Sequence, residues 1–197
     1  SPDGSMVAFE SSVWPDAADD EANAERAKQE EDDGINVSRY EIFPIRSWDS
    51  WRNEMQTRLF VQAAEPGAEV TDLLYGTDLV AEPGYSGGLD AAWTPDGEAL
   101  VISATENLDD AAFAVVHEHL YRVPLAGGEP TQLTSGEFSC TGAVFSQDGE
   151  HIYCSYEPVT EHLYNHDEIA RGLTADEVVD LGRAFYTNRD RKSVVEG

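Results

Sequence analysis

The sequence has 197 residues, of which 39 are Asp or Glu and 12 are Lys or Arg, so its formal net charge is −27. Such an excess of negative charge repels nucleic acid phosphates and anionic membrane surfaces, and both are excluded as partners. Apolar residues make up 41% of the sequence, and no run of 18 of them would span a membrane. The composition therefore predicts a globular protein, long enough for one domain or for a piece of a larger one.

A four-residue turn signal occurs at residues 1–4, 94–97 and 146–149, where the sequence reads SPDG, TPDG and SQDG. The hydroxyl side chain can accept a hydrogen bond from the turn backbone, proline presets the second φ angle, and glycine tolerates a left-handed exit. Gln147 replaces the proline in the third copy, with some loss of preorganisation. Strand-like residues flank each copy, so each tetrad is expected to close a β-hairpin.

The hairpins recur with a spacing typical of propeller blades. The second and third tetrads begin 52 residues apart, and further strand signals such as residues 119–125 follow a hairpin, which gives four short antiparallel strands per unit. The predicted fold class is all-β, a partial β-propeller over residues 1–172. It has about two and a half blades, at about residues 1–76, 85–135 and 137–165. A blade cannot bury both faces alone, so neighbours must stack on it, and this chain is not expected to close a propeller by itself.

Three segments depart from the strand pattern. Residues 16–33 are alanine-rich and charged, and they predict an exposed helix inserted in the first blade, with disorder as the alternative. Residues 173–189 are expected to form a helix-prone tail. Residues 190–197 follow no hairpin and resemble the translation of a sequencing adapter, so we treat them as a non-native scar outside the fold.

A possible nucleophile is Ser86, because residues 84–88, GYSGG, match the G-x-S-x-G string of many serine hydrolases. Such a serine needs a buried strand before it and a helix after it. Here Pro83 precedes the string, and residues 89–93 lead directly into the second tetrad with no room for a helix. No aspartate and histidine follow in a plausible triad context. Ser86 is therefore predicted to lie in a loop between blades, and no catalytic residue is predicted.

Histidines provide the only metal-binding pattern in the sequence. His117 and His119 stand at alternate positions beside a predicted strand, and His162 and His166 have the spacing of a helical zinc pair. No third ligand is placed by the sequence, so we expect surface histidines, with no metal and no cofactor.

Two further pairs leave alternatives open. Trp48 and Trp51, with Arg46 and Asp49 beside them, suit either an aromatic patch that faces a ligand or a buried anchor for the inserted helix, and the anchor is favoured. Cys140 and Cys154 lie in neighbouring predicted strands, where a disulfide is possible but two partly buried thiols are favoured. Neither pair is assigned as a binding site.

Taken together, these features resemble the propeller of the prolyl oligopeptidase family of serine peptidases, in particular its bacterial dipeptidyl-aminopeptidase and acylaminoacyl-peptidase-like members. The features that carry the resemblance are SPDGSMVAF at residues 1–9, the charged insertion from Asp16, FPIRSWDSW at residues 43–51, RLFV at residues 58–61, and the blade segments at residues 93–97 and 120–128. The resemblance covers residues 1 to about 160. The R-x-W-D-x-W segment is the most specific of these features, because periplasmic propellers of the TolB type share the tetrad.

The resemblance implies a function for the parent protein. In that family the propeller caps an α/β-hydrolase domain and limits access to short peptides, and the catalytic serine, aspartate and histidine lie in the hydrolase domain. No catalytic residue carries over to this sequence, and the segment alone is expected to be inactive. The expected partners are the hydrolase domain of the same parent chain and short peptide substrates, with a periplasmic or secreted location favoured. The alternative is a non-enzymatic, protein-binding propeller of the TolB type.

Overall fold

The computed structural model describes residues 1–32, 46–47, 50–51, 55–81, 88–106, 116–158 and 192–196, with backbone only for 46–47, 50–51, 158 and 192–196. Antiparallel strands are the predominant regular structure in this part of the chain, so the predicted all-β class is confirmed. Within these described ranges, no sheet closes on itself.

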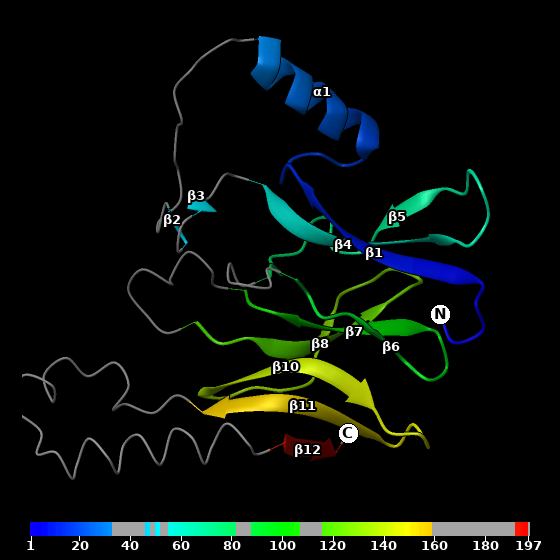
Figure 1. Cartoon of the computed structure of the whole chain (residues 1–197), viewed down its shortest axis with the longest axis vertical. Coiled ribbons are helices and arrows are strands. Elements are labelled where there is room, and N and C mark those ends of the chain that lie inside the picture. Colours follow the sequence, from blue (N-terminus) through cyan, green and yellow to red (C-terminus); the bar gives the residue numbers. More distant parts are fainter. Residues whose placement is uncertain are drawn as a thin grey trace, which may run out of the picture.

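Three sheets follow one another along the chain and stack in the same order (Figure 1). The first contains, in spatial order, β1 (Met6–Val13), β4 (Gln56–Ala63) and β5 (Val70–Asp72). The second contains β6 (Ala92–Trp93), β7 (Ala99–Ala104), β8 (His119–Pro124) and β9 (Thr131–Gln132). The third contains β10 (Phe138–Phe145), β11 (His151–Pro158) and β12 (Lys192–Glu196).

Each sheet is a meander in which strands that are consecutive in the sheet pair antiparallel. The second sheet has the four-strand order expected for one unit. A separate two-stranded ribbon, β2 (Arg46–Ser47) and β3 (Ser50–Trp51), lies between β1 and β4 in sequence. The backbone of β12 pairs with β11, so the segment that the sequence pattern placed outside the fold occupies an outer position in the third sheet.

The core lies between the sheets rather than within any one of them. The first and second sheets enclose a cluster that includes Leu59, Leu100 and Ile102, each with no exposed surface. The second and third sheets enclose another, which includes Val101 and Leu120, each 1% exposed. All six residues of β7 are buried, because its alternating side chains enter the two clusters in turn.

The three tetrads have the same local structure. The glycine N–H donates to the carbonyl of the first tetrad residue at 2.9–3.0 Å, which closes the turn. The hydroxyl of that first residue donates to the tetrad aspartate and accepts the backbone N–H five residues further on, as for Thr94 with Asp96 and Ala99. Ser1 and Ser146 repeat both contacts. The glycines have φ between 71° and 75°, which explains why glycine ends each copy.

Successive tetrads also contact one another. A Cβ atom built on Gly97 would lie 3.6 Å from the side chain of Pro2, and one built on Gly149 would lie 3.0 Å from the side chain of Pro95. In both cases the proline of one turn abuts the glycine of the next. The same relation therefore joins the first sheet to the second and the second to the third.

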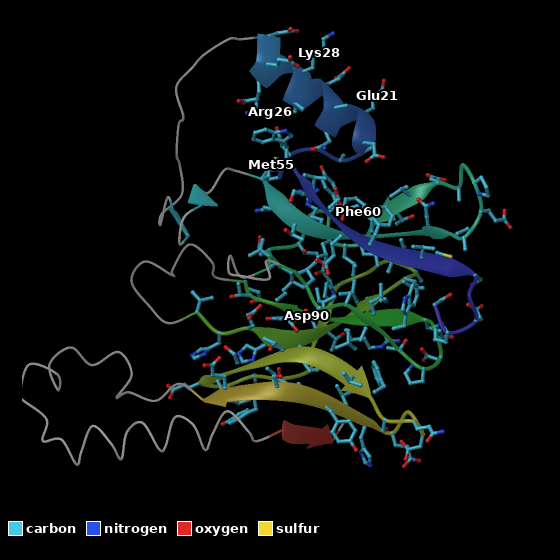
Figure 2. All side chains as sticks on the ribbon, in the orientation of Figure 1. Glu21, Arg26, Lys28, Met55, Phe60 and Asp90 are labelled. Atoms are coloured by element: carbon cyan, nitrogen blue, oxygen red, sulfur yellow. The ribbon has the colours of Figure 1, made fainter. Side chains whose placement is uncertain are left out.

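A helix, α1 (Asp20–Asp32), falls within the segment where a charged helix was expected, and it projects beside the first sheet (Figure 1). The carboxylate of Asp19 caps its first turn by accepting the N–H of Ala22 at 2.8 Å. None of its residues is buried, and Glu21 and Lys28 project from it away from the sheets (Figure 2). No helix in the described ranges is long and apolar enough to cross a membrane. The predicted tail at residues 173–189 lies outside the described residues.

Candidate functional site

The two ends of the stacked sheets differ in character. The end that carries the tetrads is formed by short, closely similar turns. β1, β7 and β11 each start at a tetrad, so they all run to the opposite end, which we call the connection end. At this end the strands β1, β7 and β11 finish, at Val13, Ala104 and Pro158. A long segment then follows each of these strands before the next strand of its sheet begins. The connection end is therefore where the long segments between strands of one sheet begin.

The segment that contains Ser86 also starts and ends at the connection end. Residues 82–87 lie outside the described residues, but both flanks pair with the last part of β7. Val80 and Thr105 exchange two backbone hydrogen bonds of 2.9 Å, and Ser103 donates to the Leu89 carbonyl at 2.7 Å. Leu89 follows this segment directly and leads toward β6, so the flanks form a connection between the first and second sheets.

Aromatic rings and histidines gather at the connection end of the second and third sheets. We call His117, His119, Phe138 and Tyr156 the aromatic–histidine cluster. Phe138 packs edge-on against His119, with ring centroids 5.7 Å apart, and tilts against Tyr156 at 5.0 Å. The two histidine rings lie 6.2 Å apart, so the predicted shared face of alternate positions is present. This cluster bridges two sheets and is half-buried.

The electrostatics of this region favour neutral side chains. Burial lowers the pKa of His119, and the adjacent His117 lowers it further, against opposing effects from Gly136 and Glu106. Burial also raises the pKa of Tyr121 to about 12, together with the charge and the hydrogen bond of Glu106. At neutral pH His119 is therefore an uncharged imidazole and Tyr121 is a phenol that donates to Glu106.

The hydroxyl of Thr134 lies close to His119, but its geometry indicates a structural role. Thr134 Oγ1 is 3.4 Å from His119 Nδ1, and it accepts the Leu120 backbone N–H at 2.9 Å. Thr134 is buried and extends the pairing of β8 beyond β9, where Leu133 donates to the Leu120 carbonyl at 2.7 Å. The hydroxyl thus replaces a missing strand acceptor rather than acting as an activated nucleophile.

A buried arginine, which the sequence pattern did not single out, anchors the start of the insertion. The Arg58 guanidinium is 3.1 Å from the Asp72 carboxylate, and their side chains are 5% and 9% exposed. The same guanidinium donates to the backbone carbonyls of Ala17, at 3.0 Å, and Pro15. It also lies over the Tyr75 ring, 5.2 Å from the centroid. The sequence feature that could have indicated this buried anchor is a charged residue, Arg58, directly before the apolar residues of β4.

A second set of contacts ties α1 to the first sheet. The Asn23 side chain accepts the backbone N–H of Trp14 at 2.9 Å, and the Arg26 guanidinium lies 5.1 Å from the centroid of the Trp14 ring. Arg26 also pairs with Glu30 at 3.1 Å. Within the described part of the chain, Trp14 and Arg58 anchor the insertion to the first sheet. The expected anchor of Trp48 and Trp51 stays a prediction, because their side chains lie outside the described residues.

The remaining predicted residues are placed only in part. Arg46 and Trp51 are opposite one another in the ribbon of β2 and β3, but their side chains are outside the description, as are Trp48 and Asp49. His162, His166 and Ser86 also lie outside the described residues. Within the described ranges, no three His, Cys, Asp or Glu residues group as metal ligands.

Comparisons with known proteins add no assignment to this geometry. No protein-family model matches the chain, and no curated protein matches it either.

Proposed function

We propose that the chain is part of a β-propeller from a serine peptidase of the prolyl oligopeptidase type, and that this propeller caps a hydrolase domain lying outside these 197 residues. The observation that carries the propeller is the repeated geometry of the three sheets. Each starts a long strand directly after a tetrad, and the contact between proline and glycine recurs from one tetrad to the next. A constant step between successive blades is what propeller geometry requires.

Equivalent positions support further blades on the side of the first sheet. Counting from the start of each tetrad, Val7 and Phe9 correspond to Leu100 and Ile102, and to Ile152 and Cys154. In the second and third sheets these residues pack toward the preceding sheet, and Leu100 and Ile102 have no exposed surface. In the first sheet Val7 is 47% and Phe9 38% exposed. The proposed occupant of this surface is one more sheet of the same kind.

The outer face of the third sheet has the same character. Val144 and Tyr153 are directly opposite one another on β10 and β11, and they are 61% and 37% exposed. Tyr153 corresponds in the repeat to Val101, which is 1% exposed between the second and third sheets. A following blade would bury both side chains, and burial of apolar area is the main favourable term in such stacking.

The peptidase part of the proposal is supported by the resemblance of residues 1–9, 43–51 and 58–61 to that family, together with the inserted helix α1. In the proposed parent enzyme, the connection end presents the long inter-strand segments and the half-buried aromatic–histidine cluster. The reaction is acyl transfer from a peptide bond to water, carried out by the hydrolase domain through a serine acyl-enzyme. The role of the propeller is to admit short peptides and exclude folded proteins.

The test compares the 197-residue chain with a chain extended through the adjoining reading frame. Both are assayed with chromogenic dipeptide and acyl-amino-acid anilides. The expected result is turnover only by the extended chain, abolished when the serine of its hydrolase domain is replaced by alanine and retained in Ser86→Ala. The proposal is wrong if the 197-residue chain is itself active and loses activity in Ser86→Ala. An extended chain with blades but no hydrolase domain would support a binding propeller of the TolB type instead.

A further inference from the structure

Two cysteines meet in the core between the second and third sheets. Cys140 on β10 and Cys154 on β11 both belong to the cluster that contains Val101 and Leu120, and they are 1% and 3% exposed. Cys140 is directly opposite Tyr156, so Cys154 lies diagonally from it on the same face of the sheet. The two Sγ atoms are 2.6 Å apart.

This placement is specific to the folded third sheet. The β-bulge between Thr141 and Val144 shifts the register of β10 directly after Cys140. Gly142, with φ of 66°, sits in the bulge, and its N–H donates to the Ser103 hydroxyl of the second sheet at 3.0 Å. The Cys140 N–H donates to the Glu118 carbonyl at 2.8 Å. Contacts with the second sheet thus hold β10 where Cys140 meets Cys154.

We propose that Cys140 and Cys154 form a disulfide bond that ties β10 to β11. The oxidant is a low-molecular-weight disulfide such as oxidised glutathione. One cysteine thiolate attacks it, which forms a mixed disulfide and releases one glutathione thiolate. The second cysteine thiolate then attacks the protein sulfur of the mixed disulfide and releases the second glutathione. The two cysteines lose two protons and two electrons, and the glutathione disulfide is reduced to two thiols.

The environment of the two sulfurs determines when the bond forms. Burial raises the pKa of the Cys140 thiol to about 12, and the neighbouring Cys154 raises it too. A buried thiol with so little thiolate exchanges slowly. The bond therefore forms quickly only while the sulfurs are still accessible during folding, and slowly once the second sheet covers them. Once formed, it resists both reductants and alkylating reagents in the native protein, as expected of a structural bond in an oxidising compartment.

The experiment measures how strongly the fold favours the bond. The 197-residue chain is equilibrated with mixtures of reduced and oxidised glutathione, in buffer and in 6 M guanidinium chloride. Samples are quenched in acid, denatured, alkylated with N-ethylmaleimide and weighed by mass spectrometry. The bonded form shows no adduct and a mass about 2 Da below the reduced chain, because two hydrogens are lost. The effective concentration of the two thiols equals the square of the reduced glutathione concentration divided by the oxidised glutathione concentration, taken where half of the protein is oxidised.

We expect the effective concentration to be on the order of 100-fold higher in buffer than in guanidinium chloride, as for a well-fitted bond that closes a loop of this length. Equal values in the two solvents would contradict the proposal, because the fold would then not hold the sulfurs together. Mixed disulfides on each cysteine in place of the internal bond would also contradict it. Cys140→Ser and Cys154→Ser are matched controls, each expected to keep one alkylated or glutathionylated thiol. Cys140→Ala combined with Cys154→Ala tests by circular dichroism whether the sheets form without either sulfur.

Discussion

The first and second sheets carry the same tetrad and the same meander, but they are buried to very different extents. All six residues of β7 are buried, whereas β1 has one buried residue in eight. Val7 and Leu100 occupy equivalent places after their tetrads, yet Val7 is 47% exposed and Leu100 is fully buried. The difference comes from the neighbours and not from the local sequence, since the second sheet has a sheet on both sides. Burial in this architecture is thus a property of position in the stack.

Truncating a buried β7 side chain should destabilise the protein far more than truncating the equivalent side chain of β1. Leu100→Ala should lower the free energy of unfolding by about 2–5 kcal/mol, because it leaves a cavity between two sheets. Val7→Ala at the equivalent position should change it by less than about 0.5 kcal/mol in this chain, because its side chain is already half in solvent. Urea unfolding followed by tryptophan fluorescence gives both values. Equal losses of stability in the two variants would contradict the conclusion that burial depends on position in the stack. In a chain extended by a preceding blade, Val7→Ala should become costly.

A smaller effect is expected at the tetrad glycines. Gly4→Ala should cost roughly 1–2 kcal/mol, because alanine is strained at φ of 75° although nothing lies within 4 Å of its Cβ. Gly149→Ala has the same φ but also meets the Pro95 side chain at 3.0 Å, so its cost should be larger. Thermal unfolding of both variants, with Gly149→Ala repeated in a Pro95→Ala background, separates strain from contact. If Pro95→Ala does not reduce the loss of stability caused by Gly149→Ala, the contact with Pro95 adds nothing to the backbone strain.

The smallest expected effect concerns the acid stability of the tetrads. Hydrogen bonds from Ser1 and Ser5 lower the pKa of Asp3 to about 2, and bonds from Thr94 and Glu98 lower the pKa of Asp96. A carboxyl group whose pKa is depressed on folding stabilises the protein above its unfolded pKa, and this stabilisation is lost as the pH falls through the folded value. Stability should therefore decline between about pH 4 and about pH 2, where these groups take up protons.

The corresponding variant is Asp96→Asn, which should make this acid decline shallower because one of the titrating groups is removed. Glu98→Gln removes an exposed charge next to the same turn and leaves the turn's side-chain bonds intact, so it should leave the shape of the decline unchanged. Urea midpoints measured from pH 2 to 7 provide the comparison. If Glu98→Gln flattens the curve as much as Asp96→Asn does, net charge rather than the turn governs acid stability.

Much of the local architecture was predictable from the sequence. The tetrads predicted their hairpins because the hydroxyl and aspartate side chains bond within the turn, and glycine adopts its positive φ, all within four residues. The alanine-rich, charged composition of residues 16–33 predicted α1, because helix propensity is also a property of the local sequence. The site was less predictable: Thr134 and Phe138 join His119 only because β8, β9 and β10 are brought together across two sheets.

Strands, turns and the all-β class follow from the amino-acid order, because they depend on interactions between residues close together in the chain. Long-range contacts made Arg58 the buried anchor of the insertion, and they brought the Sγ atoms of Cys140 and Cys154, already expected on neighbouring strands, to 2.6 Å. Arg58 reaches Ala17 across 41 residues, and the bulge that accompanies Cys140 is bonded to Ser103 across 39. Which distant groups meet depends on how strands and insertions pair across the fold, and periodicity within one strand cannot specify that pairing.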